Sequence, residues 1–374
     1  MFFKEVIGQD AIKQRLIQSV QEERVSHAQL FAGPEGTGKL ALAIAYAQFV
    51  ACTNRQENDS CGECPSCKKY KKLIHPDLHF VFPVVKTPKF KEPVSDNFLD
   101  DWRLMIARNP YFNVDQWFSQ IGVENAQGLI YSHQSEEIIR KLNLKSYESE
   151  YKVMIIWLPE KMHVACANKL LKMIEEPPVK TLFILITENE EDIISTIRSR
   201  CQMITIPPIE SGALSKAISQ LPEAEGIDIR NIVHLAKGNY GKAIELLEPD
   251  DQSQFNLDRF KELMRLSYGR KFLDLFSWVD QVAGIGREKQ KSLLNYFLIS
   301  LRENFIYNLK NKELTFMSEQ EEEFSKRFSP FINERNIIEL TEVFETAFGH
   351  IGMNGNPRII FTDIAFKVVK LIRK

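Results

Sequence analysis

The stretch GPEGTGKL at residues 33–40 constrains the fold of this chain more than any other feature. The short apolar run AQLFA leads into it, and the helix-forming stretch LALAIAYAQFVA follows its lysine. This order is the context of the phosphate-binding motif G-x-x-x-x-G-K-[ST], in which backbone N–H groups cradle phosphates and the lysine reaches their oxygens. We therefore expect an α/β core with a phosphate loop, whose candidate binding residues are Gly33, Gly36, Gly38 and Lys39.

The last position of this loop departs from the motif. Leu40 stands where a serine or threonine hydroxyl normally holds Mg²⁺, and a hydrocarbon side chain offers the metal no oxygen. A second departure lies at the end of the apolar run KVMIIWL (152–158). Phosphate-loop ATPases carry an aspartate and often a glutamate there, whereas this chain has Trp157 and Leu158. We therefore expect no efficient ATP hydrolysis. ATP binding without turnover stays possible, and we expect it to be weak or absent.

Composition and charge narrow the class of protein further. The 374 residues carry 48 Lys+Arg against 50 Asp+Glu, a formal net charge of -2, so no overall basic field draws the chain to DNA. Any nucleic-acid contact must then be local or supplied by partners. The apolar runs are strand-length, short of the roughly 20 residues of a membrane span. MFFKEVIGQD lacks the features of a signal peptide, so we expect a cytoplasmic protein with no membrane contact.

The order of predicted elements divides the chain into an α/β half and a helical half. TLFILIT (181–187) is a second continuous apolar run, as parallel strands covered on both faces require, and CQMITIPPI (201–209) closes the α/β part. From Ser211 onward helical periodicity dominates. The polar stretch LEPDDQSQ (247–254) predicts the last domain boundary.

Four of the six cysteines form the pattern C-x8-C-x2-C-x2-C, and they are Cys52, Cys61, Cys64 and Cys67. Thiols this close in a turn-rich stretch of a cytoplasmic chain favour a tetrahedral zinc site over disulfides. With four protein ligands such a zinc is structural. An iron–sulfur cluster is the main alternative, although the further cysteine of its common run is missing, and four unrelated reduced thiols are the other. Cys166 and Cys201 are expected in the core.

Several longer strings together resemble one known family. They are SHAQLFAGPEGTGK, the four-cysteine segment, HPDLH, KVMIIWLPEKMHVACANKLLKMIEEPP and ISTIRSRCQ. In this order they are similar to the AAA+ subunits of the bacterial DNA polymerase III clamp loader, over about residues 1–250. The missing acidic pair makes the delta-prime type the nearer match, because the gamma/tau type keeps that pair.

The resemblance implies an architecture and a set of partners. It implies an AAA+ (RecA-like) core at 1–208 with a zinc insert at 52–67, a small helical lid at 209–250 and an all-α collar domain at 251–374. Implied partners are gamma/tau and delta subunits in a hetero-pentamer, with the sliding clamp and primer–template DNA reached through the assembly. The function implied is that of a non-hydrolysing subunit.

The resemblance also carries a role for Arg200. In the family the S-R-C string precedes the last core strand, and its arginine projects toward the nucleotide of a neighbouring subunit. A guanidinium supplied in trans stabilises charge on the transferring phosphoryl group. By residue type alone, a helix cap or a salt bridge is the favoured role of Arg200, and only the surrounding string reverses that preference. Two other residues correspond more weakly to functional positions of the family. Thr187 lies near a nucleotide-sensing position, although a threonine at the end of a strand is ordinarily a turn residue. Lys242 lies near the position of a second sensing arginine, although a lysine on a helix is ordinarily solvated.

Two questions stay open at this level. Residues 87–127 look longer than the matching stretch of the family, and a surface elaboration is the default expectation. The alternative function is an active AAA+ ATPase with atypical metal ligands, in which Thr37 or Glu160 replaces the missing groups. Because Glu160 lies beyond Pro159, we expect it to be a solvated residue or a helix cap.

Overall fold

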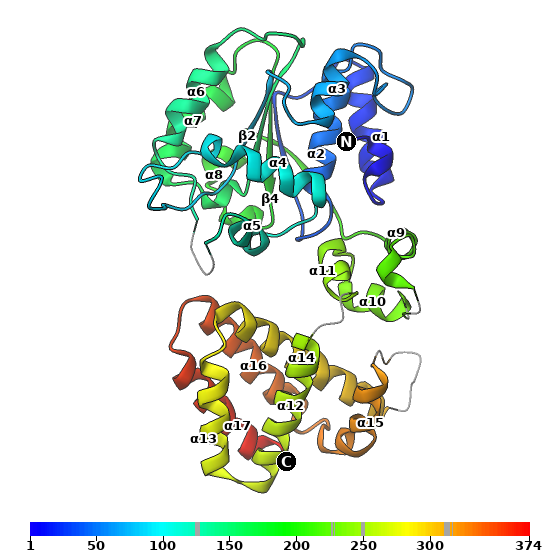
Figure 1. Ribbon diagram of the computed structural model, residues 1–374, viewed down its shortest axis with the longest axis vertical. Coiled ribbons are helices and arrows are strands. Elements are labelled where there is room, and N and C mark those ends of the chain that lie inside the picture. The colour runs from blue at the N-terminus through cyan, green and yellow to red at the C-terminus, as the bar shows by residue number, and fades with distance from the viewer. Residues whose placement is uncertain (124–127, 226, 228, 248–250, 310–314, 316) are drawn as a thin grey trace. The chain divides into compact units, whose positions relative to one another are not determined.

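The computed structural model consists of two compact units, Met1–Leu247 and Glu248–Lys374 (Figure 1). It describes all residues except 124–127, 226, 228, 248–250, 310–314 and 316. The predicted boundary between lid and C-terminal domain, at residue 250, and the end of the 87–127 insert therefore lie outside the described residues. No helix in the described ranges is long and apolar enough to cross a membrane.

A five-stranded parallel sheet forms the centre of the first unit, with the strand order β2-β3-β4-β1-β5. The strands are β1 (Ala28–Ala32), β2 (Leu78–Val81), β3 (Lys152–Trp157), β4 (Thr181–Thr187) and β5 (Gln202–Thr205). Every residue of β1, β3 and β4 is buried, which explains their continuous apolar sequences. Register pairs Ala32 with Thr187 and Trp157 with Ile186, so the carboxyl ends of these strands meet at one edge.

Helices cover both faces of this sheet, as Figure 1 shows. They are α1 (Asp10–Gln21), α2 (Lys39–Ala51), α3 (Pro65–Lys71), α4 (Leu99–Arg108), α5 (Val114–Gln120), α6 (Gln134–Asn143), α7 (Val164–Glu175) and α8 (Ser195–Arg198). The strand side chains alternate between two cores. In β3, Ile155 packs with the core that contains α2, whereas Met154 and Ile156 pack with α6 and α7. Three short helices complete the unit, α9 (Ser211–Ile218), α10 (Ile229–Ala236) and α11 (Tyr240–Glu245), and we call them the lid.

The expectation that residues 87–127 form a surface elaboration is wrong for the described part of that segment. The side chains of Trp102 and Trp117 are fully buried, and they lie in the same core as Trp157 of β3. Trp102 stacks on Phe82, with ring centroids 4.1 Å apart, and its centroid lies 5.1 Å from that of Trp117. The aromatic side chains of this segment are buried because α4 and α5 cover the ends of β2 and β3. Burial of such large apolar rings stabilises the folded state.

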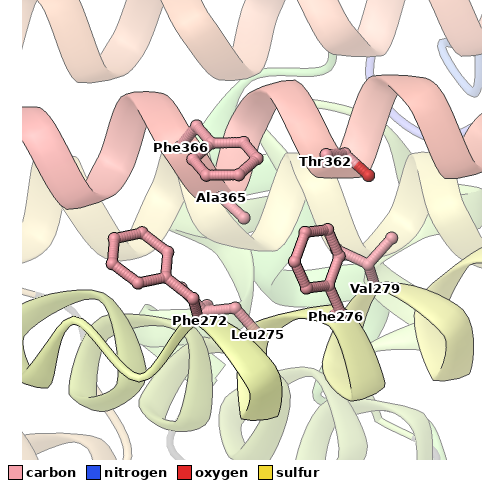
Figure 2. Close-up of a pocket in the computed structure, with 7 residues that line it drawn as sticks. All are labelled: Phe272, Leu275, Phe276, Val279, Thr362, Ala365 and Phe366. Atoms are coloured by element: carbon pink, nitrogen blue, oxygen red, sulfur yellow. The ribbon is translucent and has the colours of Figure 1, made fainter.

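The second unit is entirely helical within its described residues. Its helices are α12 (Asp251–Gly269), α13 (Phe272–Ala283), α14 (Arg287–Asn308), α15 (Glu319–Phe328), α16 (Ile337–Gly352) and α17 (Pro357–Leu371). Its core is mainly aliphatic, and several aromatic side chains pack within it, among them Phe260, Trp278 and Phe297. A small apolar pocket lies between α13 and α17, and Figure 2 shows Phe272, Phe276 and Phe366 around it. The structure thus confirms the expected fold class, an α/β core with a helical lid and a helical C-terminal domain.

Candidate nucleotide site and metal centre

The phosphate loop connects β1 to α2 at the carboxyl edge of the sheet. Gly36 and Gly38 have φ angles of +68° and +87°, which favour glycine because a Cβ atom is strained there. Lys39 begins α2 and is buried, and its Nζ donates hydrogen bonds to the carbonyl oxygens of Gly33, at 2.7 Å, and Pro34. The loop therefore has the backbone shape of a phosphate site.

The side chains that would hold Mg²⁺ in such a loop are absent or already bonded. Leu40 is buried in the α2 core. The Thr37 hydroxyl, considered above as a replacement ligand, donates to the carbonyl oxygen of Pro34 at 2.9 Å. Trp157 takes the place of the strand-end carboxylate and packs against Trp102 and Phe112, with centroid distances of 5.2 and 5.4 Å. An aromatic cluster thus stands where phosphate-loop ATPases place acidic metal ligands.

Glu160 is neither a freely solvated residue nor a helix cap, so that expectation is wrong. It lies in the 3₁₀ turn Pro159–Lys161, is only partly exposed, and accepts a hydrogen bond from the backbone N–H of Glu188 at 3.3 Å. Burial raises the pKa of the Glu160 carboxyl. The turn folds back toward the sheet because Leu158 adopts a left-handed conformation, φ 56°, and its N–H bonds to the Ile186 carbonyl at 2.8 Å.

Sequence reasoning missed Glu188, which lies beside the phosphate-loop lysine. Burial raises the pKa of Glu188 to about 7, and the nearby charge of Lys39 opposes that rise. Burial lowers the pKa of Lys39 to about 8, opposed by the carboxylates around it, of which Glu188 has the largest effect. The pairing of β1 with β4 gives the reason, because residue 188 directly follows the β4 residue that pairs with Ala32. Carboxyl groups of the same chain thus lie near the lysine, whose Nζ donates its hydrogen bonds to backbone carbonyl oxygens.

Lid residues also contact the phosphate loop. The N–H of Tyr240 donates to the Gly36 carbonyl at 3.0 Å, and the Asn239 amide donates to Glu35 Oε1 at 3.4 Å. A Cβ atom on Gly36 would lie 1.7 Å from Asn239 Oδ1, so only glycine fits this approach. The beginning of α11 therefore rests directly on the phosphate loop.

The two weaker sequence correspondences lie near this loop. The Thr187 hydroxyl donates to the Asn189 carbonyl at 2.9 Å and accepts from the Asn189 N–H, which is a turn contact. Lys242 of α11 is partly buried rather than fully solvated, and burial lowers its pKa while Glu35 and Glu245 oppose that change.

Arg200 lies on the surface after α8, just before β5. Its side chain is 34% exposed and forms an ion pair with Glu175 of α7, Nε to Oε2 3.1 Å, while its Nη1 donates to the Thr196 carbonyl at 3.0 Å. Arg198, two residues earlier, is exposed. Arg200 Nη2 also donates to Glu175 Oε1 at 3.4 Å, so two contacts form the pair. Because the Glu175 side chain is 55% exposed, solvent screens the pair, and an exposed ion pair contributes about 0–1 kcal/mol, so the guanidinium can exchange partners.

Four thiols form a compact cluster beside α2 and α3. Cys52 follows the last residue of α2 and Cys64 caps the beginning of α3. The sulfur of Cys61 lies 3.6 Å from that of Cys52 and 4.0 Å from that of Cys67, and all four sulfurs lie within 4.8 Å of one another. Backbone N–H groups of the cluster also donate to its sulfurs at 3.4 Å, as they do around bound thiolates. This arrangement can hold a metal ion and is compatible with zinc.

The sheet order, the loop between β1 and α2, and the helical lid define a phosphate-loop protein of the AAA+ class. A family model described as "DNA polymerase III, delta subunit" matches residues 8–210, more than half of the chain. The chain therefore belongs to the DNA polymerase III delta subunit family, which confirms the resemblance noted in the sequence.

Two relatives and one solved structure illustrate the similarity. The DNA polymerase III subunit delta' of Bacillus subtilis (strain 168) is 26% identical over 309 residues, 82% of this chain and 79% of that protein. The subunit tau of the same organism is 23% identical over 389 residues, covering 98% of this chain but only 61% of the relative. A gamma subunit-related protein of Thermotoga maritima superposes with a TM-score of 0.45 and 12% identity, over 96% and 99% of the two chains.

Proposed function

We propose that this chain is a non-hydrolysing subunit of a DNA polymerase III clamp loader, which assembles with motor subunits of the gamma/tau type and a delta subunit. Family membership and the delta' and tau relatives support this assignment. The motor subunits hydrolyse ATP, and the assembly loads the sliding clamp onto primed DNA. This chain contributes contacts and one side chain, and its own loop binds ATP weakly or not at all.

The replacement of the strand-end carboxylates by Trp157 and Leu158 is the observation that carries the proposal. Both side chains are at most 4% exposed, and Trp157 is fixed in an aromatic cluster. Phosphoryl transfer needs a positioned metal ion and an oriented nucleophile, because the protein contributes little covalent chemistry of its own. Neither Thr37 nor Glu160 supplies the missing groups, since the hydroxyl of the first is bonded to Pro34 and the second faces the Glu188 backbone.

Arg200 is the residue that we assign to a neighbouring subunit's ATP site. The S-R-C string places it between α8 and β5, and its weak ion pair with Glu175 leaves it available for phosphate oxygens. An arginine supplied in trans contributes about 10³- to 10⁵-fold to phosphoryl transfer. The four cysteines hold a structural zinc, which joins the end of α2 to α3 and takes no part in turnover.

ATP turnover of the complex with the cognate motor and delta subunits tests the assignment. The Arg200→Ala variant should still assemble, because the residue makes only exposed contacts. ATP turnover at the site that receives Arg200 should fall by about 10³-fold. The total turnover of the complex should fall by the fraction that this site contributes to it. Arg198→Ala is the matched control, because that arginine is exposed on the same segment, and it should turn over ATP like the wild type.

The isolated chain is the second arm of this experiment. We expect it to release no phosphate from ATP above the rate of a Lys39→Ala variant. Lys39-dependent hydrolysis by the isolated chain would refute the non-hydrolysing assignment. Equal turnover by complexes with Arg200→Ala and wild type would refute the role of the arginine while leaving the assembly role in place.

A further inference from the structure

Tyr111 lies between the phosphate loop, the N-terminal segment and the lid. It sits in the connection from α4 to α5, and its side chain is 6% exposed. The Tyr111 hydroxyl oxygen accepts a hydrogen bond from the backbone N–H of Ile7 at 2.9 Å. The ring edge touches the end of the loop so closely that a Cβ atom on Gly38 would lie 2.8 Å from Cε1. One side chain therefore bonds to the N-terminal segment and packs on the loop.

The same residue also contacts the lid. The rings of Tyr111 and Tyr240 meet edge to face, with centroids 4.9 Å apart. The Tyr111 carbonyl oxygen lies so near Gly241 that a Cβ atom there would be 2.8 Å away. Burial raises the pKa of the Tyr111 phenol, so it stays neutral among these groups.

Neighbouring residues of the α4–α5 connection extend this contact. Asn113 caps the beginning of α5, and its amide approaches Glu35 Oε1 of the phosphate loop at 3.5 Å. Gln116 Nε2 donates to Glu245 Oε1 of α11 at 3.0 Å. Because Asn239 of the lid donates to the same Glu35 oxygen, the connection, the loop and the lid share one polar network.

The cleft between core and lid is separated from the phosphate loop at this point. It has a volume of about 1070 Å³, and Ile7, Pro110, Tyr111, Leu221 and Tyr240 are among its lining residues. No residue of the loop, 33–40, lines it. A nucleotide with its phosphates on the loop and its base in the cleft would have to displace the Tyr111 ring.

We propose that Tyr111 is an internal plug: it takes the place between loop and lid that a nucleotide would need, and it holds the lid on the core without a ligand. The plug rests on the proposed function only in treating the loop as a former ATP site. A nucleotide that contacts both the loop and the lid couples its own binding to closure of the lid. In this subunit Tyr111 makes those contacts instead, so the lid keeps one position whether or not nucleotide is present.

Hydrogen exchange of the zinc-loaded full chain tests the plug. Tyr111→Ala removes the ring, so peptides covering 236–247 and the N-terminal segment around Ile7 should exchange about tenfold faster, while strands β1, β3 and β4 exchange as before. Tyr111→Phe keeps the ring and removes only the acceptor, so faster exchange should be confined to the segment around Ile7. Tyr147→Ala is the control, because that tyrosine is 80% exposed, and it should match the wild type.

Nucleotide binding by the wild type is the second measurement. ATP or ADP at about 1 mM, with Mg²⁺, should leave the exchange of residues 33–40 and of the lid unchanged. Protection of the loop by nucleotide in the wild type would overturn the plug, and so would unchanged lid exchange in Tyr111→Ala. No partner subunit is present in this test, so its outcome is independent of the Arg200 result. Hydrolysis of ATP by the isolated chain would refute both the non-hydrolysing assignment and the plug.

Discussion

Removal of a ligand from the four-cysteine cluster is expected to abolish metal binding and to loosen the first unit. A tetrahedral site with Zn–S bonds of about 2.3 Å requires sulfurs about 3.8 Å apart. The cluster has Sγ–Sγ distances of 3.6 Å between Cys52 and Cys61 and 4.0 Å between Cys61 and Cys67. These two distances differ from that value by about 0.2 Å, and all four sulfurs lie within 4.8 Å of one another, so movements of an ångström or less bring the thiols into position to hold zinc.

The size of the effect follows from linkage between binding and folding. Free zinc at about 1,000 times its dissociation constant stabilises the folded state by about 4 kcal/mol. For a unit the size of Met1–Leu247, each kcal/mol shifts the melting temperature by about 2–4 °C. Zinc removal, or the Cys64→Ser substitution at zinc levels that saturate the wild type, should thus lower the melting temperature of this unit by about 8–16 °C.

Metal analysis and calorimetry of the same samples check this prediction. The wild type should contain one zinc ion per chain, and Cys64→Ser little or none. Cys201→Ser is the matched control, because Cys201 is a partly buried thiol outside the cluster, and it should keep the zinc. A melting temperature that chelators leave unchanged would refute a stabilising metal, and iron with visible charge-transfer absorption would show a cluster of the iron–sulfur type instead.

Two further predictions concern the first unit. Trp102→Ala removes the centre of the aromatic cluster around Trp157 and should lower the free energy of unfolding of the unit, measured in urea, by about 3–5 kcal/mol. Leu104→Ala, at an exposed position of the same helix, should change that free energy little. Equal effects of the two substitutions would contradict the burial of this segment. Between pH 4.5 and about 7 the folded chain keeps a proton on Glu188 that the unfolded chain has lost, so stability falls as pH rises through this window. Glu188→Gln should reduce that fall by up to about 3 kcal/mol, measured by urea unfolding from pH 4.5 to 8, and an unchanged pH profile would contradict the burial of this carboxyl.

Features that depend on a local pattern of residues could be predicted from the amino-acid sequence. The glycines of 33–40 need positive φ at two positions, and the apolar runs of β3 and β4 have the length and continuity of buried parallel strands. The spacing of the four cysteines is short enough that the chain cannot keep them far apart. Each of these signals lies within about 16 residues, so no knowledge of the tertiary fold was needed to interpret them.

The surroundings of the phosphate loop, in contrast, depend on how distant parts of the chain fold together. Glu188 reaches Lys39 because β4 pairs with β1, and Tyr111 reaches Gly38 because α4 and α5 fold back over the sheet edge. These partners are separated by more than 70 residues in the chain, and nothing in the local sequence of either one specifies the other. Their meeting depends on strand order and on the burial of a distant aromatic cluster, which act only once the whole unit has folded.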